Sequence, residues 1–354
     1  MKHVLALVIL FMAMNLPLIG CTTFLINKDG QLAFGRNYDW VTDAGLVCKN
    51  HRGLSKTSYG EPGEPTVSWV AKYGSLTFNQ YGKEFPTGGM NEKGLVVELM
   101  WLDGSKYPKP DSRATLNVLQ WIQYQLDNCA TIDEVIATDQ LIRIGADNPP
   151  LHYLVADARG QAATIEFLSG KMVMHKGKDL PIPVLTNTDY ASSMKAVQNS
   201  GIHDGKEAAK FNDNSLQRFA TACSMVKEFH ENDSKQSIID FSFDVLKNVS
   251  QEGWTRWSIV YDITNKAIYF KTDRFPTIKS IAFADFDFSC HTQTLAFNMN
   301  QLLSGKVSKE FKPLTKEINK QLMDRSAEES KTQVTISEAD RVRQAEYAVK
   351  IACK

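Results

Sequence analysis

The chain has 354 residues, of which 43% are hydrophobic and 23% are charged, so it is long enough to bury a large core in one or two domains. Its 40 basic and 40 acidic residues cancel, and there is no basic stripe or arginine cluster, which argues against a nucleic-acid partner. CxxC, HExxH, Walker and GxGxxG motifs are missing and the seven histidines show no ligand spacing, so neither a metal nor another cofactor is expected.

The chain begins with a hydrophobic leader. A short positive end precedes the uncharged apolar run Val4–Met14, and Gly20 places a small residue before Cys21. The run is too short to span a membrane, so residues 1–20 are predicted to be a signal peptide of an exported, periplasmic protein. Leu18–Cys21 also fits the pattern at which bacterial lipoproteins are cleaved and lipidated on cysteine, so a lipid-anchored protein is the alternative. No second apolar segment approaches membrane-spanning length.

Removal of the leader before Cys21 would leave one residue with both a free thiol and a free α-amine. A thiol has an unperturbed pKa of about 8.5 and an α-amine about 7.7–8.0, so near neutrality part of the amine can accept the thiol proton. Strands are predicted over Thr22–Ile26 and Gln31–Arg36, joined by an Asp-Gly turn. This hairpin returns Arg36 and Asp39 to the neighbourhood of Cys21.

The rest of the chain alternates between blocks of strands and blocks of helices. Further strands are predicted over Gly94–Trp101, His152–Ala156, Ala162–Leu168, Val184–Asn187, Trp257–Ile263 and Ala267–Thr272. Helices are predicted over Leu116–Leu126, from the capping box at Thr131 through Ile142, and over Ser215–His230 and Ser237–Val249. This order suggests an α+β fold in which two sheets lie inside outer helices.

Two regions stand outside this pattern. From about Ser304 the chain is charged and mostly helical, and it is interpreted as a solvated flank of a single domain over residues 21–354. The six cysteines lie far apart in the sequence. If Cys21 is a nucleophile, five remain and cannot all pair within the chain, so most are expected to be small buried hydrophobes rather than a disulfide framework.

Six short motifs together resemble the choloylglycine hydrolase and penicillin V acylase family of N-terminal nucleophile hydrolases. They occur in the family's order and rough spacing: Cys21–Thr23, Phe34–Asp39, Gly89–Leu95, Pro150–Tyr153, Val184–Asn187 and Arg218–Phe219. The resemblance extends from Cys21 to about Phe288. It implies a four-layer αββα sandwich and hydrolysis of a linear amide bond.

The resemblance also implies site residues at matching positions. Cys21 attacks the amide carbonyl while its α-amine relays the proton, Asp39 holds that amine, and Arg36 favours the thiolate. Asn187 donates to the oxyanion of the tetrahedral intermediate, and Arg218 supports the charge near the sulfur. Without the resemblance, these polar residues would be explained as ordinary turn, strand or helix-surface side chains.

Two departures from the family pattern bear on substrate and assembly. Trp101 stands where bile-salt hydrolases carry Asn and penicillin V acylases often carry Tyr, and together with Trp40 it is expected to bind the acyl group, although both could be core aromatics. The segment between Asn187 and Arg218 lacks the longer insertion that helps many members to form tetramers. A homo-oligomer is therefore left open, and the chain resembles the exported, Gram-negative branch.

Three functions remain open at this point. The preferred one is an amidase that deconjugates glycine- or taurine-linked bile salts. The second is an amidase for penicillin V or an N-acyl homoserine lactone. The third is a lipid-anchored binding protein without catalysis, against which the collection of Arg36, Asp39, Asn187 and Arg218 argues. The partner in the first two cases is a small N-acyl amide.

Overall fold

The computed structural model describes residues 20–59, 63–200, 211–231 and 235–354. The predicted signal peptide, except for Gly20, lies outside this part of the chain. Within the described ranges, none of the helices combines the length and the apolar character that a membrane crossing requires.

Two large sheets form the centre of the fold. The first is seven-stranded, in the order β14-β1-β2-β15-β16-β17-β19. Its strands are β1 (Thr22–Lys28), β2 (Gln31–Asp39), β14 (Val184–Leu185), β15 (Thr255–Asp262), β16 (Ala267–Thr272), β17 (Lys279–Ala282) and β19 (Gly305–Lys306). Because β1 and β2 lie within it, this sheet presents Cys21 at the start of its β1 strand.

The second sheet is nine-stranded, in the order β13-β12-β11-β8-β7-β6-β3-β18-β20. Its strands are β3 (Leu46–Asn50), β6 (Ser75–Asn79), β7 (Pro86–Asn91), β8 (Val96–Trp101), β11 (Leu151–Ala156), β12 (Ala162–Leu168), β13 (Lys171–Lys176), β18 (Leu295–Asn298) and β20 (Lys312–Pro313). Two small sheets accompany it, formed by β9 (Ala114–Leu116) with β10 (Ile142–Ile144), and by β4 (Leu54–Thr57), β5 (Ser68–Val70) and β21 (Ala352–Cys353).

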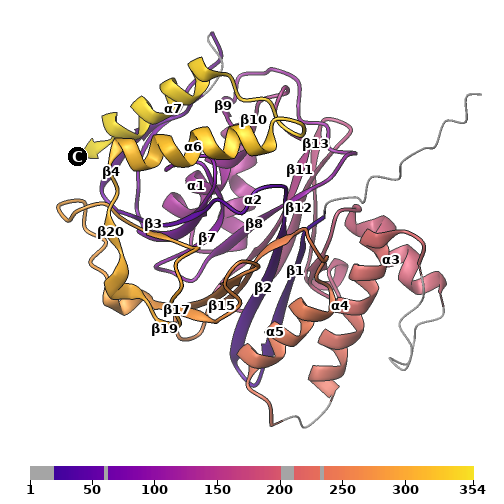
Figure 1. The fold of residues 1–354 in the computed structure, drawn as a ribbon. Coiled ribbons are helices and arrows are strands. Elements are labelled where there is room, and N and C mark those ends of the chain that lie inside the picture. The colour runs from indigo at the N-terminus through magenta and orange to yellow at the C-terminus, as the bar shows by residue number, and fades with distance from the viewer. Residues whose placement is uncertain (1–19, 60–62, 201–210, 232–234) are drawn as a thin grey trace, which may run out of the picture.

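Helices cover the outer faces of both large sheets, which gives the expected four-layer αββα arrangement (Figure 1). The helices α4 (Asn214–Glu231) and α5 (Ile238–Asn248) lie beside β1 and β2, and α3 (Tyr190–Asn199) packs against α4. On the other side are α1 (Val118–Asn128), α2 (Ile132–Ala137), α6 (Lys316–Ser330) and α7 (Glu338–Lys350). Asn91 ties α1 to β7 by donating hydrogen bonds of 2.8 Å to two carbonyls at the end of the helix.

Aromatic side chains fill the space between the two sheets. Phe78 of β6 packs edge-on against Tyr261 of β15 and Phe270 of β16, at centroid distances of 6.0 and 5.7 Å. All three are fully buried. Burial of aromatic surface between the sheets is therefore a main stabilising contribution, and it fixes the sheet that presents Cys21 against the sheet that supplies Trp101.

Local signals predicted the strands β1, β2, β8, β11, β12 and β14–β16 and the helices α1, α2, α4 and α5, whereas α3 and the remaining strands were not predicted. Three of the expectations differ from the structure. The helix expected to run from Thr131 through Ile142 ends at Ala137, because Ile142–Ile144 pairs in parallel with β9 instead. The expected strand at Val184 stops at Leu185. The segment interpreted as a solvated flank is helical, but α6 buries Leu322 and Met323 against the body, so that interpretation is wrong for this helix.

The cysteines behave mostly as expected. Cys21, Cys48, Cys129 and Cys223 are free and buried, while Cys290 and Cys353 form a disulfide.

Candidate active site

The hairpin that carries the site is built by a left-handed turn. Asp29 and Gly30 have φ of 53° and 77°, which matches the right-handed twist of the strands they join. The pairing register places Thr22 opposite Asn37 and Thr23 opposite Arg36. Cys21, at the head of β1, therefore lies beside the end of β2, where its sulfur is 4.0 Å from the carbonyl oxygen of Asp39.

Alternation along β2 divides the expected site residues between two faces. Arg36 faces the other sheet, where its guanidinium forms an ion pair with Glu98 and donates to the carbonyls of Thr87 and Leu99 at 3.2 and 3.3 Å. Asp39 is three positions further along the strand, so its side chain points to the opposite face, toward the loop after α5. The two charges thus approach the region of Cys21 from opposite sides of the strand.

The carboxylate of Asp39 is only 1% exposed, and one of its oxygens is unused. Oδ2 accepts a 2.7 Å hydrogen bond from Gln251. Thr255 lies opposite Asp39 where a bulge disturbs the β2–β15 register, but no described side chain donates to Oδ1 at hydrogen-bond geometry. Burial raises the pKa of Asp39, and the charge of Arg218 and the side chains of Thr255 and Gln251 oppose this. Oδ1 is therefore a ready acceptor for one more donor.

Arg218 connects α4 to the nucleophile. Its Nη1 donates to the carbonyl of Cys21 at 2.6 Å and to the hydroxyl of Thr22 at 2.7 Å, and its Nη2 donates to Oδ1 of Asn187 at 2.9 Å. Asn187 in turn donates from Nδ2 to the carbonyl of Trp101 at 2.8 Å. Because an amide nitrogen carries two hydrogens, Asn187 has a second N–H for a further acceptor.

The thiol of Cys21 is held in its protonated form in the uncut chain. Burial raises its pKa and the charge of Asp39 raises it further, whereas Arg36, Arg218 and the hydrogen bond to the carbonyl of Asp39 lower it. The net shift is upward, so the expected effect of Arg36 on the thiolate is outweighed by burial. A thiol in this environment needs a nearby base before it can attack a carbonyl.

A cavity of about 300 Å³ opens beside Cys21 and Asp39. Trp40 and Trp101 both line it, with ring centroids 6.0 Å apart and planes inclined by 33°. Trp40 is 9% exposed and donates from Nε1 to the hydroxyl of Tyr81 at 2.7 Å, whereas Trp101 is partly buried and donates to Asp103 at 2.6 Å. The two indoles make a continuous apolar wall next to the nucleophile.

In the uncut chain, Gly20 lies against Asn187 and Arg218. Its carbonyl accepts a 2.7 Å hydrogen bond from Gln251. A Cβ at this position would lie 2.1 Å from Oδ1 of Asn187 and 2.4 Å from Nη2 of Arg218. Arg36, Asn187 and Arg218 do not line the cavity, and Gly20 covers the last two. Removal of Gly20 would therefore extend the cavity to Asn187.

Sequence reasoning missed two residues of this site. Gln251 bridges Gly20 and Asp39, but it lies in a short loop with no motif of its own. Glu98 is fully buried against Arg36 and accepts a hydrogen bond from Tyr261, and burial raises its pKa to about 7 although Arg36 and Tyr261 oppose this. A charged residue in the middle of an apolar strand was the one available signal for Glu98.

In the part of the chain that the structure describes, no grouping of metal ligands lies at the cavity. Among the described residues, the one set of cysteine, histidine and acidic side chains close enough to share an ion is Cys290, His291 and Cys353. Two of these are joined in the disulfide, and none of the three lines the cavity. The chemistry of the described site is that of a thiol, two guanidiniums, two carboxyl groups and two side-chain amides.

Comparisons with known proteins agree with this geometry. Residues 21–296 match the model of the linear amide C–N hydrolases, choloylglycine hydrolase family. The chain therefore belongs to this family, whose match begins at Cys21, and is a linear amide C–N hydrolase.

Individual relatives include penicillin V acylases. One from Pectobacterium atrosepticum is 28% identical, with 83% of this chain and 90% of that protein covered. The solved structure of penicillin V acylase from Agrobacterium tumefaciens aligns with a TM-score of 0.74 at 26% identity, covering 83% of this chain and 98% of that one. A conjugated bile acid hydrolase from Clostridium perfringens, in its R18L variant, shares the fold at a TM-score of 0.67 and 17% identity, with 80% and 98% covered.

Proposed function

We propose that this hydrolase is exported, that removal of residues 1–20 frees the α-amine of Cys21, and that Cys21 then cleaves an N-acyl amide. The observation that carries the proposal is the unused, buried Oδ1 of Asp39 near the head of β1. The nitrogen of Cys21 is an amide in the uncut chain and becomes an amine after the cut. That amine supplies the donor that Oδ1 lacks and the base that the thiol needs.

In the proposed reaction, the α-amine accepts the thiol proton as sulfur bonds to the amide carbon. Asn187 donates its second N–H to the oxyanion, while Arg218 holds the side-chain oxygen of Asn187 and the carbonyl of Cys21. Collapse of the intermediate breaks the C–N bond, and the α-ammonium returns the proton to the leaving nitrogen. Water then attacks the thioester, which releases the carboxylic acid and regenerates the thiol.

For the acyl group, we propose an aryl substituent of the phenoxyacetyl type first and the steroid of a bile conjugate second. The two relatives named above that exceed 25% identity are penicillin V acylases, whereas the bile acid hydrolase supports the shared fold alone. This reverses the order preferred from sequence. The bile conjugate remains the second candidate because the apolar wall of Trp40 and Trp101 continues into a cavity larger than the site of bond cleavage requires. Acyl homoserine lactones belong in the same comparison.

The burial of Cys21 supports a free thiol rather than a lipid anchor. Cys21 is 4% exposed and lines the cavity described above. A diacylglycerol on that sulfur would have to fill the cavity or displace β1 from its neighbours. A lipid-anchored binding protein would also have no use for the unpaired oxygen of Asp39.

The test combines the mass of the mature protein with a substrate panel. The purified exported protein should have the mass of a chain that begins at an unmodified Cys21. It should hydrolyse penicillin V with a higher kcat/KM than glycocholate, taurocholate or an N-acyl homoserine lactone. Cys21→Ala should abolish hydrolysis of every substrate and leave thermal unfolding nearly unchanged. Full activity of Cys21→Ala would remove the mechanism, and a diacylglycerol on the terminal cysteine of active protein would remove the proposed maturation.

A further inference from the structure

The region after the family match contributes to the cavity that holds the nucleophile. The match ends at residue 296, and α6, α7 and β21 follow it. These three elements and the loops between them, residues 316–354, are called the C-terminal arm below. Val334, Ile336 and Arg343 of the arm line the same cavity as Cys21.

We propose that the C-terminal arm determines which acyl groups this enzyme accepts, with Val334 and Ile336 as an apolar outer wall that long or bulky acyl groups touch and short ones do not. This inference rests on the proposed cleavage of an N-acyl amide at Cys21. The hydrogen bonds of Cys21, Asp39, Asn187 and Arg218 go to no residue of the arm. The arm therefore closes a part of the cavity away from the reacting atoms.

The outer wall is held to the body by aromatic contacts. The guanidinium of Arg343 lies 4.5 Å from the ring centroid of Tyr59, and Tyr347 packs against Tyr59 and Phe85 at centroid distances of 5.9 Å. The hydroxyl of Tyr347 also donates to the carbonyl of Thr57 at 2.7 Å. Because these contacts come from α7 itself, the wall is positioned by a packed interface rather than by the loop alone.

A chain of hydrogen bonds connects the arm to the inner wall. The indole N–H of Trp40 donates to the hydroxyl of Tyr81 at 2.7 Å, and Tyr81 donates to the hydroxyl of Ser330 at 3.0 Å. Ser330 ends α6 and donates to the carbonyl of Ser326 at 2.7 Å. A displacement of α6 would thus remove a partner from the side chain that orients Trp40.

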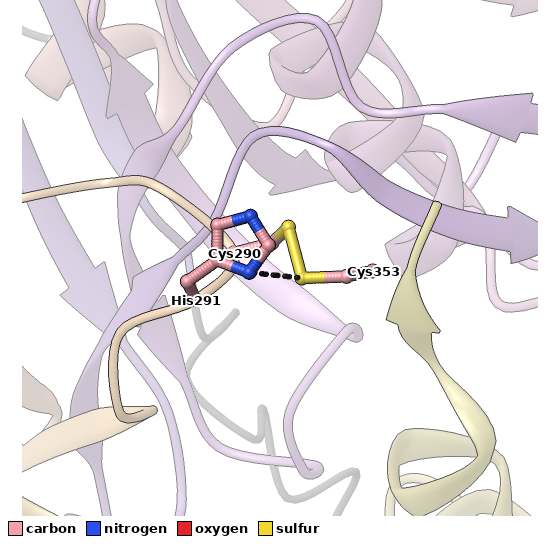
Figure 2. A group of neighbouring side chains, drawn as sticks. All are labelled: Cys290, His291 and Cys353. Carbon is pink, nitrogen blue, oxygen red and sulfur yellow. Dashed lines mark hydrogen bonds between the residues drawn. A yellow bond between two sulfur atoms is a disulfide. The ribbon is translucent and has the colours of Figure 1, made fainter.

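A disulfide fastens the far end of the arm (Figure 2). Cys290, just before the end of the family match, is bonded to Cys353 of β21, with Cα atoms 5.6 Å apart and a sequence separation of 63. Nδ1 of His291 lies 3.8 Å from Sγ of Cys353. β21 pairs with β4, so covalent and backbone contacts meet at this end. Opening the disulfide would let the arm sample more arrangements, because the loop would no longer be closed.

The cavity chemistry identifies the class of acyl group. The arm lines the cavity with the aliphatic side chains of Val334 and Ile336, and also with Thr335, Gln344 and the ion pair of Asp340 with Arg343. The opposite lining includes Leu116, Val118 and Leu119. The aliphatic part of this lining offers a contact surface for alkyl or steroid carbon. A phenoxy group bound against Trp40 and Trp101 needs no contact with the arm, whereas a twelve-carbon chain or a steroid extends beyond the indoles.

The test measures binding of product acids to mature Cys21→Ala protein, so that it is independent of turnover. Phenoxyacetate serves as the short acid, and dodecanoate and cholate serve as the large ones, with affinity measured by calorimetry. Adding Val334→Ala and Ile336→Ala should weaken the binding of at least one large acid by about fivefold or more, because two aliphatic contacts are shortened. The affinity for phenoxyacetate should change by less than about twofold. Val342→Ala is the matched control, since Val342 lies on α7, is 40% exposed and does not line the cavity.

Equal effects on short and large acids, no effect on any acid, or failure of the parent to bind them would overturn the inference. Hydrolysis by the wild type with arm-independent binding would reject the inference and retain the proposed function. If acid binding depends on the arm but the wild type hydrolyses no amide, the inference about the arm is retained and the proposed function is rejected. The double variant Cys290→Ser, Cys353→Ser should also bind the large acids more weakly than the parent. Unchanged affinities would overturn the role of the disulfide.

Discussion

Nη1 of Arg218 donates a 2.6 Å hydrogen bond to the carbonyl oxygen of Cys21, while Nη2 of the same guanidinium donates to the side chain of Asn187. One side chain of α4 therefore fixes the backbone of the nucleophile and the orientation of the proposed oxyanion donor together. With its oxygen held by Arg218, the amide of Asn187 must direct its nitrogen toward the carbonyl of Trp101 and the space beside it.

Asn187→Ala should lower kcat by about 10²–10³ with little change in KM, because the amide acts on charge that develops in the transition state. Steady-state kinetics on penicillin V measures this. Asn199→Ala, at an exposed position at the end of α3, provides the control and should leave both constants unchanged. A large rise in KM at constant kcat would instead assign Asn187 to ground-state binding.

Asp39→Asn should move the acidic limb of the kcat/KM profile to lower pH and reduce the maximum. A nearby carboxylate stabilises the protonated α-amine and so raises its pKa, and the neutral amide removes this effect. The amine would then be available as a base at lower pH, but it would be less well held. The pH–rate profile of each protein over the acidic range gives the result, and an unmoved acidic limb would show that Asp39 does not face the amine.

Glu98 should make the protein less stable as pH rises from about 4.5 to about 7. Its folded-state pKa is raised to about 7 from an ordinary value of 4.5, so within this window the native state binds a proton that the unfolded state has already lost. The free energy of unfolding contributed by this group is therefore largest below the unfolded pKa, and it decreases until the folded pKa is passed.

Denaturant unfolding of wild type and Glu98→Gln at pH 5 and pH 8 tests this sign. The variant lacks the titrating group, so the stability of the wild type relative to the variant should be greater at pH 5 than at pH 8. The variant also leaves Arg36 without its ionic partner, which changes its stability at every pH. The titration of Glu98 is therefore measured by how the stability difference between the two proteins changes with pH. A difference that does not change with pH would contradict the raised pKa.

Trp101→Ala should raise KM for acyl substrates by about tenfold or more, since loss of a large apolar contact costs roughly 1.5–3 kcal/mol. Its thermal stability should change little, because the indole is only partly buried. Trp69 offers the contrast: it is 8% exposed, donates to Asp127 and does not line the cavity. Trp69→Ala should cost about 3–5 kcal/mol of stability and leave the KM of the remaining folded protein near that of wild type. A similar loss of stability in both variants would make Trp101 a core residue.

Features set by neighbouring residues are predictable from the sequence, whereas features set by pairing between distant segments are not. The Asp29-Gly30 turn was predictable because the chemistry of a tight turn lies within the turn itself. The helix starting after Thr131 was predicted too long, because its end is decided by the pairing of Ile142 with Ala114, which periodicity does not contain. Gln251 was missed for the same reason, since it meets Asp39 only after β2 and β15 have paired.

The C-terminal arm shows the other limit. Its helices are rich in charge, which suggested a solvated segment, yet α6 buries Leu322, Met323 and Ala327. A narrow apolar stripe among charged residues is weak evidence in sequence, and its partner surface is formed by elements far away in the chain.

The position of the outer wall in the sequence also sets the order in which the cavity is assembled. Synthesis proceeds from Cys21 toward Val334, and every other residue that lines the cavity precedes the arm. The ribosome therefore produces the nucleophile first and the residues that enclose it afterwards. The complete lining of the substrate cavity therefore requires that α7 has reached Tyr59.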